Sequence, residues 1–167
     1  MKNRTQFIAL LLIGFTANVF AQASAAATTT VTIVTPIGIT KTVDMTFGNI
    51  STTPAPGTVV LGTDGVRTPN GGVTLPASTG TVTAASFAVT GTGSYTYTIS
   101  LPASPITLSG TTDGVTVGAF VSNPASTGTL SAGTQTVNVG ATLIIPASTA
   151  ADTYKNTSGL RVTVNYN

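Results

Sequence analysis

The chain has 167 residues, no cysteine and no histidine, and charged residues make up only 6% of it. A typical soluble domain carries about 25% charged residues, so Thr, Ser, Asn and Gly must form most of the surface. Residues after position 23 carry four Lys or Arg (six minus Lys2 and Arg4) and four Asp, a net charge of zero. The sequence pI of 9.2 therefore gives no reason to expect nucleic acid or an acidic partner.

Residues 1–23 have the pattern of a signal peptide, in which a basic start precedes an apolar run over residues 7–20. Small residues at the end of this segment predict cleavage between Ala23 and Ser24. An uncleaved anchor is the less favoured alternative, because the apolar run is short for a membrane span. We therefore expect an exported protein, in the periplasm, at the cell surface or outside the cell, with no membrane span once the signal is removed.

The remaining chain predicts one domain. Residues 24–30 are small and are expected to form a flexible lead-in, and residues 31–167 are expected to form a single β domain. An exported chain without cysteine has no disulfide to stabilise it. Its length is nevertheless sufficient for one adequate hydrophobic core.

The first strand pattern begins at Val31, and apolar residues then occupy alternate positions, including Ile33, Ile37 and Ile39. This alternation predicts a strand with one buried face. Pro36 interrupts it, and because proline cannot donate to a ladder, the segment is expected at a sheet edge or split into two strands.

Further strands are expected at short intervals. A change of apolar phase between Ala84 and Ala85 predicts a β-bulge, and Gly-containing turns such as Asp64-Gly65 separate the segments. Outside the signal, no segment has a helical period. Many short strands favour an immunoglobulin-like antiparallel β-sandwich, with a β-barrel as the alternative. The expected strands are 58–61, 72–75, 81–90, 95–101, 115–121, 136–145 and 160–166.

The last strand closes the chain. Leu160, Val162, Val164 and Tyr166 fall on every second position, so one face of this strand is expected to be buried. The strand has no polar tail after it, and tyrosine is the residue before the last.

The chemistry of common enzymes is missing from residues 24–167, which contain no His, Cys, Glu or Trp. This composition excludes Ser-His-Asp and Cys-His nucleophiles, zinc sites built on His or Cys and glutamate-based glycosidase pairs. Asp64 and Asp113 each precede glycine and are expected in turns. Asp44 is expected to face solvent, and Asp152 lies in a loop. We therefore expect no enzyme activity, no metal and no cofactor.

Binding chemistry is equally sparse. Four scattered cations cannot form the basic stripe that nucleic-acid binding requires. Tyr95 and Tyr97 share a phase with Ile99 and Leu101, so both tyrosines are expected in the core rather than on a sugar-binding platform.

The order of several segments resembles the DUF4402 family of secreted bacterial domains across the whole chain after the signal. This family is in turn similar to spore coat protein U domains and chaperone–usher pilins. The segments that carry the resemblance are Phe47-Gly48, 71–75, 85–91, 95–99, 139–143 and 162–166.

The resemblance implies an incomplete sandwich that is completed by a strand from outside. In pilins, a periplasmic chaperone and later the N-terminal strand of the next subunit fill the gap. By this likeness Leu160, Val162, Val164 and Tyr166 would form the strand that partners contact. Val31, Ile33, Ile37 and Ile39 would match the donated strand. This chain departs from pilins in lacking a disulfide and in carrying Pro36 within the donor.

Two functional hypotheses follow. The first is a structural or adhesive subunit of a fimbria-like or cell-surface matrix assembly, whose partners are copies of itself, related subunits or a periplasmic chaperone. The second is a self-complete secreted binding module for a glycan or surface partner, in which residues 31–39 pair within their own sheet. A third, a hydrolase, would need activity that depends on Asp44 or Asp152, and none is expected.

Overall fold

A computed structural model describes residues 22–157 and 159–167. The chain divides into two units, Met1–Thr32 and Ile33–Asn167. The predicted signal peptide falls outside the described residues up to position 21, and residues 22–32 form no helix or strand. The described part of the chain contains no helix that is long and apolar enough to cross a membrane.

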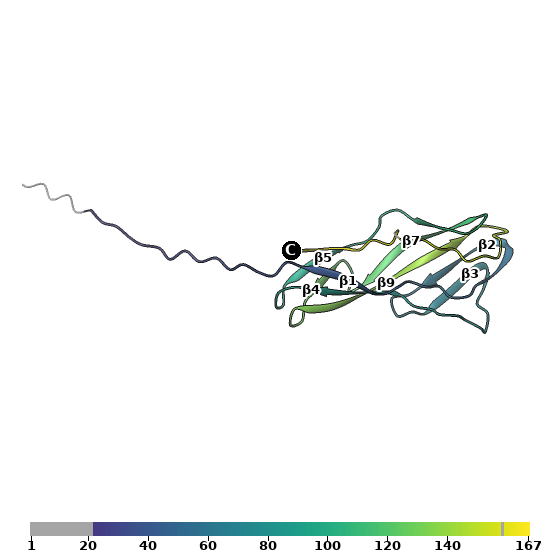
Figure 1. Cartoon of the computed structure of the whole chain (residues 1–167), viewed down its shortest axis with the longest axis horizontal. Coiled ribbons are helices and arrows are strands. Elements are labelled where there is room, and N and C mark those ends of the chain that lie inside the picture. Colours follow the sequence, from purple (N-terminus) through teal and green to yellow (C-terminus); the bar gives the residue numbers. More distant parts are fainter. Residues whose placement is uncertain (1–21, 158) are drawn as a thin grey trace, which may run out of the picture. The chain divides into compact units, whose positions relative to one another are not determined.

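Residues 33–167 form an antiparallel sandwich of two sheets (Figure 1). The larger sheet has the order β1-β4-β9-β2-β3. The strands β4 and β2 pair with successive parts of β9, and β7 pairs with β9 along its opposite edge. The strand β6 pairs with β7. The smaller sheet has the order β10-β5-β8. Neither sheet closes into a barrel within the described residues, so the predicted sandwich is confirmed. The strands are β1 Gly38–Val43, β2 Ser51–Leu61, β3 Arg67–Thr74, β4 Ala85–Thr90, β5 Thr96–Ser100, β6 Ile106–Ser109, β7 Gly114–Asn123, β8 Thr127–Thr129, β9 Thr134–Ile145 and β10 Thr163–Tyr166.

Two hydrophobic clusters share the interior, and β9 contributes to both. The first lies between the sheets and includes Tyr97, Val137 and Val164. The second includes Val59 and Leu143 and is formed by the part of the larger sheet that contains β2, β3 and β7. Alternation of buried and exposed residues, clearest in β4 and β5, places many hydroxyl-bearing side chains outside, which is why so few charges are enough for the surface.

The first strand is shorter than the apolar alternation suggests, because β1 begins only at Gly38, two residues after Pro36. It is an edge strand that pairs with β4 alone. Both facts agree with the expected effect of proline on a ladder. The predicted bulge is misplaced: β4 pairs with β9 without interruption, and the register shift lies in β1 between Lys41 and Val43. The phase change at Ala84 instead marks where β4 begins.

Four strand segments escaped the sequence patterns, and the first is residues 67–71 of β3, which pair with β2 although only 72–75 was expected as a strand. The front half of β2 contains Pro54 and Pro56, which resemble a loop, and its pairing with β3 is irregular between Thr52 and Gly57. The strands β6 and β8 are only four and three residues long, so neither shows enough alternation to be recognised.

The two tyrosines at the start of β5 differ. Tyr97 is fully buried, as predicted, and its hydroxyl donates to Gln135 Oε1 at 2.7 Å. Tyr95 lies one residue before the strand and is 48% exposed, so its predicted core position is wrong. Its ring packs edge-on against Tyr166, with 5.7 Å between centroids.

Candidate strand-pairing site

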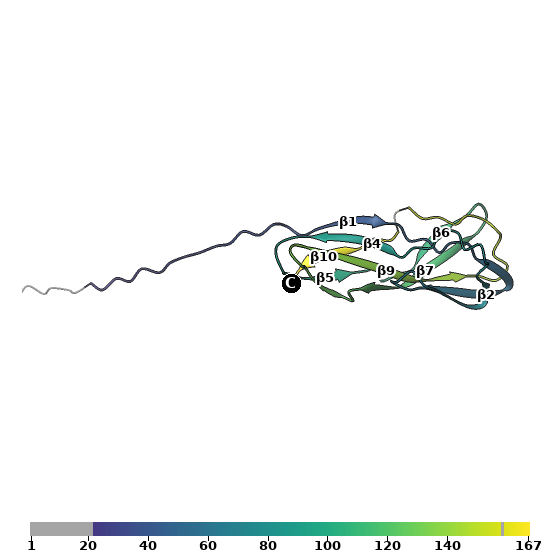
Figure 2. The ribbon, with the colours of Figure 1, turned by 90° about the horizontal axis from the view of Figure 1, so that it is seen from below.

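Two strand edges lie next to each other without being paired. The strand β1 ends the larger sheet and β10 ends the smaller one, and among the described residues neither outer edge has a partner. The two strands are in contact, and the C-terminus lies at the end of the sandwich where β1 begins (Figures 1 and 2). The two edges therefore run in opposite directions along an opening between the sheets.

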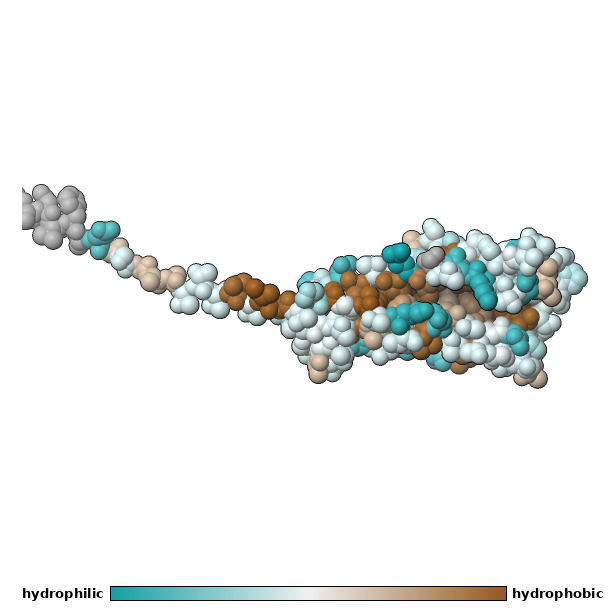
Figure 3. Space-filling model, in the orientation of Figure 1, coloured by the Kyte–Doolittle hydropathy of each residue, from teal (hydrophilic) through white to brown (hydrophobic). Residues whose placement is uncertain are grey.

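An apolar groove continues this opening. Figure 3 shows hydrophobic residues gathered in a band along the face of residues 33–167 that carries β1, between rims of polar residues. A pocket of about 150 Å³ lies where the end of β1, the start of β4, β6 and residues 156, 157 and 160 meet. Its apolar lining comes from both sides of the opening and from the core beneath, namely Met45, Phe47, Phe87, Ile106, Leu108 and Leu160. We call this lining, together with the unpaired edges of β1 and β10, the apolar groove.

The rim of the apolar groove is electrically neutral at its centre. Lys41 Nζ and Asp44 Oδ1 form an ion pair there, and their side chains are largely exposed. Such an exposed pair contributes little stability. Asp44 faces solvent, as the sequence predicts.

The last strand places its apolar residues as predicted. Val162 and Val164 are buried in the first cluster, and Leu160 and Tyr166 are half-buried against it. In the ladder with β5, Val164 stands opposite Ile99 and Tyr166 opposite Tyr97. All four side chains therefore lie on the face of this segment that is turned toward the core.

Tyr166 connects three segments through one hydroxyl. Its oxygen accepts from the amide of Thr92 at 2.8 Å and donates to the carbonyl of Thr35 at 3.0 Å. The amide of Thr35 in turn donates to Thr92 Oγ1 at 2.8 Å. A Cβ on Gly91 would lie 2.2 Å from this hydroxyl, so glycine is required for the close approach. We call this hydrogen-bonded set of Tyr166, Thr35 and Thr92 the Tyr166 bridge.

The predicted N-terminal donor is divided by the structure. Ile37 and Ile39 are half-buried against the first cluster, and Ile39 pairs with Val89 in the chain's own sheet. Val31 and Ile33 belong to no strand and are 82% and 91% exposed. The C-terminal half of the segment thus serves as a first strand, whereas the apolar side chains of the other half are exposed and belong to no strand.

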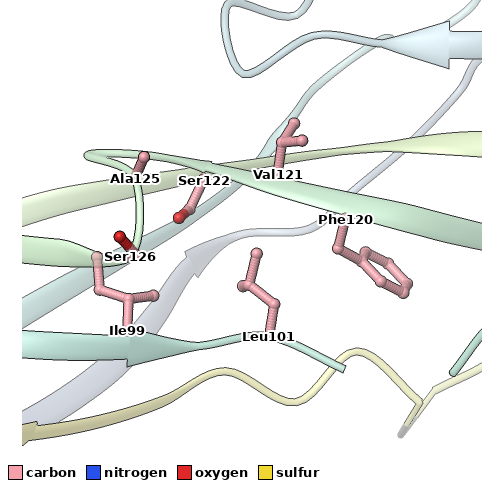
Figure 4. A pocket seen from close by; sticks show the side chains of 7 residues that line it. All are labelled: Ile99, Leu101, Phe120, Val121, Ser122, Ala125 and Ser126. Carbon is pink, nitrogen blue, oxygen red and sulfur yellow. The ribbon is translucent and has the colours of Figure 1, made fainter. Parts of the chain in front are cut away.

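A second apolar hollow lies elsewhere in the sandwich, with a volume of about 310 Å³, beside the part of β7 where its register with β9 shifts between Gly118 and Val121. Figure 4 shows Ile99 and Leu101, from β5 and its end, and Phe120 from β7 gathered around one space, with Ser122 and Ser126 at its margin. The alternation of apolar residues over 95–101 predicts core positions for Ile99 and Leu101. No feature of the sequence predicts the hollow itself.

The aspartates serve local structure. Asp64 accepts from the amide of Val66 in its predicted turn, and Asp113 accepts from the amide of Ala150. Asp152 accepts from the amide of Thr111, and this hydrogen bond holds the pKa of its carboxyl below the usual value. Among the described residues, no group of three or more acidic, His or Cys side chains could hold a metal ion.

Comparison with known proteins gives one result. No curated protein and no solved structure matches this chain. A family model described as a domain of unknown function, DUF4402, matches residues 37–166. That span starts just before β1 and ends at Tyr166, so it covers every strand described above. The chain therefore belongs to the DUF4402 family, as its resemblance predicted.

Proposed function

We propose that this protein is an exported, non-enzymatic structural or adhesive subunit of a fimbria-like or cell-surface matrix assembly, held together by β-strand pairing. One observation carries the proposal: the apolar groove, where two unpaired strand edges flank half-buried hydrophobic side chains. An added strand would pair with the free edge of β10 and cover those side chains, which is how extended segments bind at sheet edges.

The chain also contains a segment suited to fill this groove in another copy. Val31 and Ile33 alternate with threonines and lie outside every strand. Exposed hydrophobic residues of this kind are normal singly, but the alternation matches the side-chain period of a strand. Burial of a Val or Ile side chain contributes about 1.5–3 kcal/mol, so two such residues supply a useful part of an interface. Export follows from the signal pattern at residues 1–23.

The self-complete binding module is the second candidate. It is favoured by the pairing of β1 with β4, which uses Ile37 and Ile39 within the chain's own fold. On this account, the loops would contact a glycan or surface partner, and residues 24–34 would be a dispensable lead-in.

A matched pair of substitutions separates the two candidates. Ile33→Asp changes a side chain that is 91% exposed, and Val66→Asp changes one that is 61% exposed in a turn. Neither should alter the stability of the monomer, because both sites face solvent. We expect residues 24–167 to form concentration-dependent oligomers in size-exclusion chromatography with light scattering. Ile33→Asp and deletion of residues 24–34 should abolish them, whereas Val66→Asp should not. A monomer in all four proteins would contradict strand donation.

A further inference from the structure

The apolar groove has two different ends. At one end, Met45 and Leu160 lie on its two sides, and no hydrogen bond between the described residues 41–47 and 159–162 crosses it. At the other end, the Tyr166 bridge joins the last residues of β10 to Thr35, just ahead of β1. The hydrogen bond from the Tyr166 hydroxyl in the smaller sheet to the carbonyl of Thr35, just before the larger sheet begins, thus spans the opening at this end.

We infer that the Tyr166 bridge closes this end of the groove and thereby fixes the register of an incoming strand. The inference rests on the proposed function and names the partner as residues 24–35 of a second copy of this chain. A strand added along the free edge of β10 cannot extend past the bridge without breaking it, so its leading end stops there.

A stop is needed because the sequence of the incoming strand does not fix the register. A slip of one residue would turn its apolar face outward, but a slip of two residues preserves the face. On the apolar face of this segment, Val31 and Ile33 are flanked by Thr29 and Thr35, so a register shifted by two residues still places one of the two apolar side chains in the groove. A closed end selects one of these registers by position.

The hydroxyl of Tyr166, rather than its ring, performs this task. Its ring packs against the first cluster and against Tyr95, contacts that phenylalanine retains. Tyr166→Phe therefore keeps the packing and removes both hydrogen bonds of the hydroxyl. Tyr95→Phe is the matched control, since it removes a hydroxyl from the other ring of the same pair. Tyr166 is a positioning residue in this proposal.

Disulfide cross-linking can test the register directly, because the chain contains no cysteine of its own. A donor protein carrying Thr32→Cys, on the strand face opposite Ile33, is mixed with acceptor proteins carrying cysteine at one of three exposed alternate positions, Arg161, Thr163 or Asn165. A disulfide requires Cβ atoms about 3.5–4.5 Å apart, so each acceptor position reports one register. Both partners span residues 24–167, and circular dichroism verifies their folding.

We expect one acceptor position to dominate with the native tyrosine and with Tyr95→Phe in the acceptor. Tyr166→Phe in the acceptor should distribute the product over at least two positions, while the total yield of cross-linked dimer is retained. An unchanged single position in Tyr166→Phe would overturn the inference and leave strand donation intact. Absence of any cross-link with the native acceptor would contradict strand donation itself, and the inference with it.

Discussion

Substitution of Gly91 by alanine tests the Tyr166 bridge through stability alone. The new Cβ would lie 2.2 Å from the Tyr166 hydroxyl and 2.9 Å from Leu130 Cδ1. Gly91 does not have a positive φ, so alanine is not strained by its backbone and the cost is purely steric. Overpacking of this kind costs about 1–3 kcal/mol. We therefore expect the midpoint of thermal unfolding to fall by about 2–4 °C per kcal/mol, measured by circular dichroism.

The double variant Gly91→Ala with Tyr166→Phe makes this prediction specific. Tyr166→Phe alone should cost about 0.5–1.5 kcal/mol for each hydrogen bond that it removes. Removal of the hydroxyl also removes the nearest obstacle to the Cβ, so the double variant should be more stable than the sum of the single effects by about 1 kcal/mol. Gly65→Ala is the control, because nothing lies within 4 Å of its Cβ and its cost should not depend on residue 166. If the effects of Gly91→Ala and Tyr166→Phe on the free energy of unfolding were strictly additive, the Tyr166 bridge would be refuted.

Three further predictions concern the fold and its response to pH. Arg67→Ala should lower the free energy of unfolding by about 1.5–3 kcal/mol in denaturant titration, because Arg67 Nη1 donates to the carbonyls of Phe47 at 2.6 Å and Asn49 at 2.8 Å. An effect near zero would mean that these hydrogen bonds do not stabilise residues 47–49. Val164→Ala should cost about 1–3 kcal/mol through the cavity that it leaves in the core, whereas Thr163→Ala on the outer face should change stability by less than about 0.5 kcal/mol; equal effects would contradict the assigned faces of β10. The lowered pKa of Asp152 stabilises the fold above the usual carboxyl pKa of 3.8, and this stabilisation should be lost as the pH falls below that value. Asp152→Asn should lack this part of the acid response. Identical acid unfolding curves for the two proteins would contradict the prediction.

Strand faces could be predicted from the sequence wherever side chains alternate in an isolated run. The terminal run from Leu160 to Tyr166 is the best case, because period two leaves only one choice of buried face. The four apolar residues of that run lie where the alternation places them. The same rule failed at Tyr95, since alternation cannot indicate that β5 begins one residue later.

The candidate site depended on information that a one-dimensional pattern does not contain. Alternation over residues 31–39 is the same on both sides of Pro36, so it could not indicate that Ile39 pairs with Val89 while Ile33 stays outside every strand. The apolar groove arises where two sheet edges from opposite ends of the chain meet. The role of the Tyr166 hydroxyl likewise depends on Thr35, 131 positions away, and no local signal marks such a pair.

Amide hydrogen exchange of the assembled protein tests strand donation most directly. Residues 24–167 would be compared at high concentration with the Ile33→Asp variant under the same conditions. Strand donation predicts that assembly slows exchange in residues 28–35 and along the outer edge of β10, with little change in β3 and β8. Equal exchange of residues 28–35 in the two proteins, or protection confined to the loops, would contradict it.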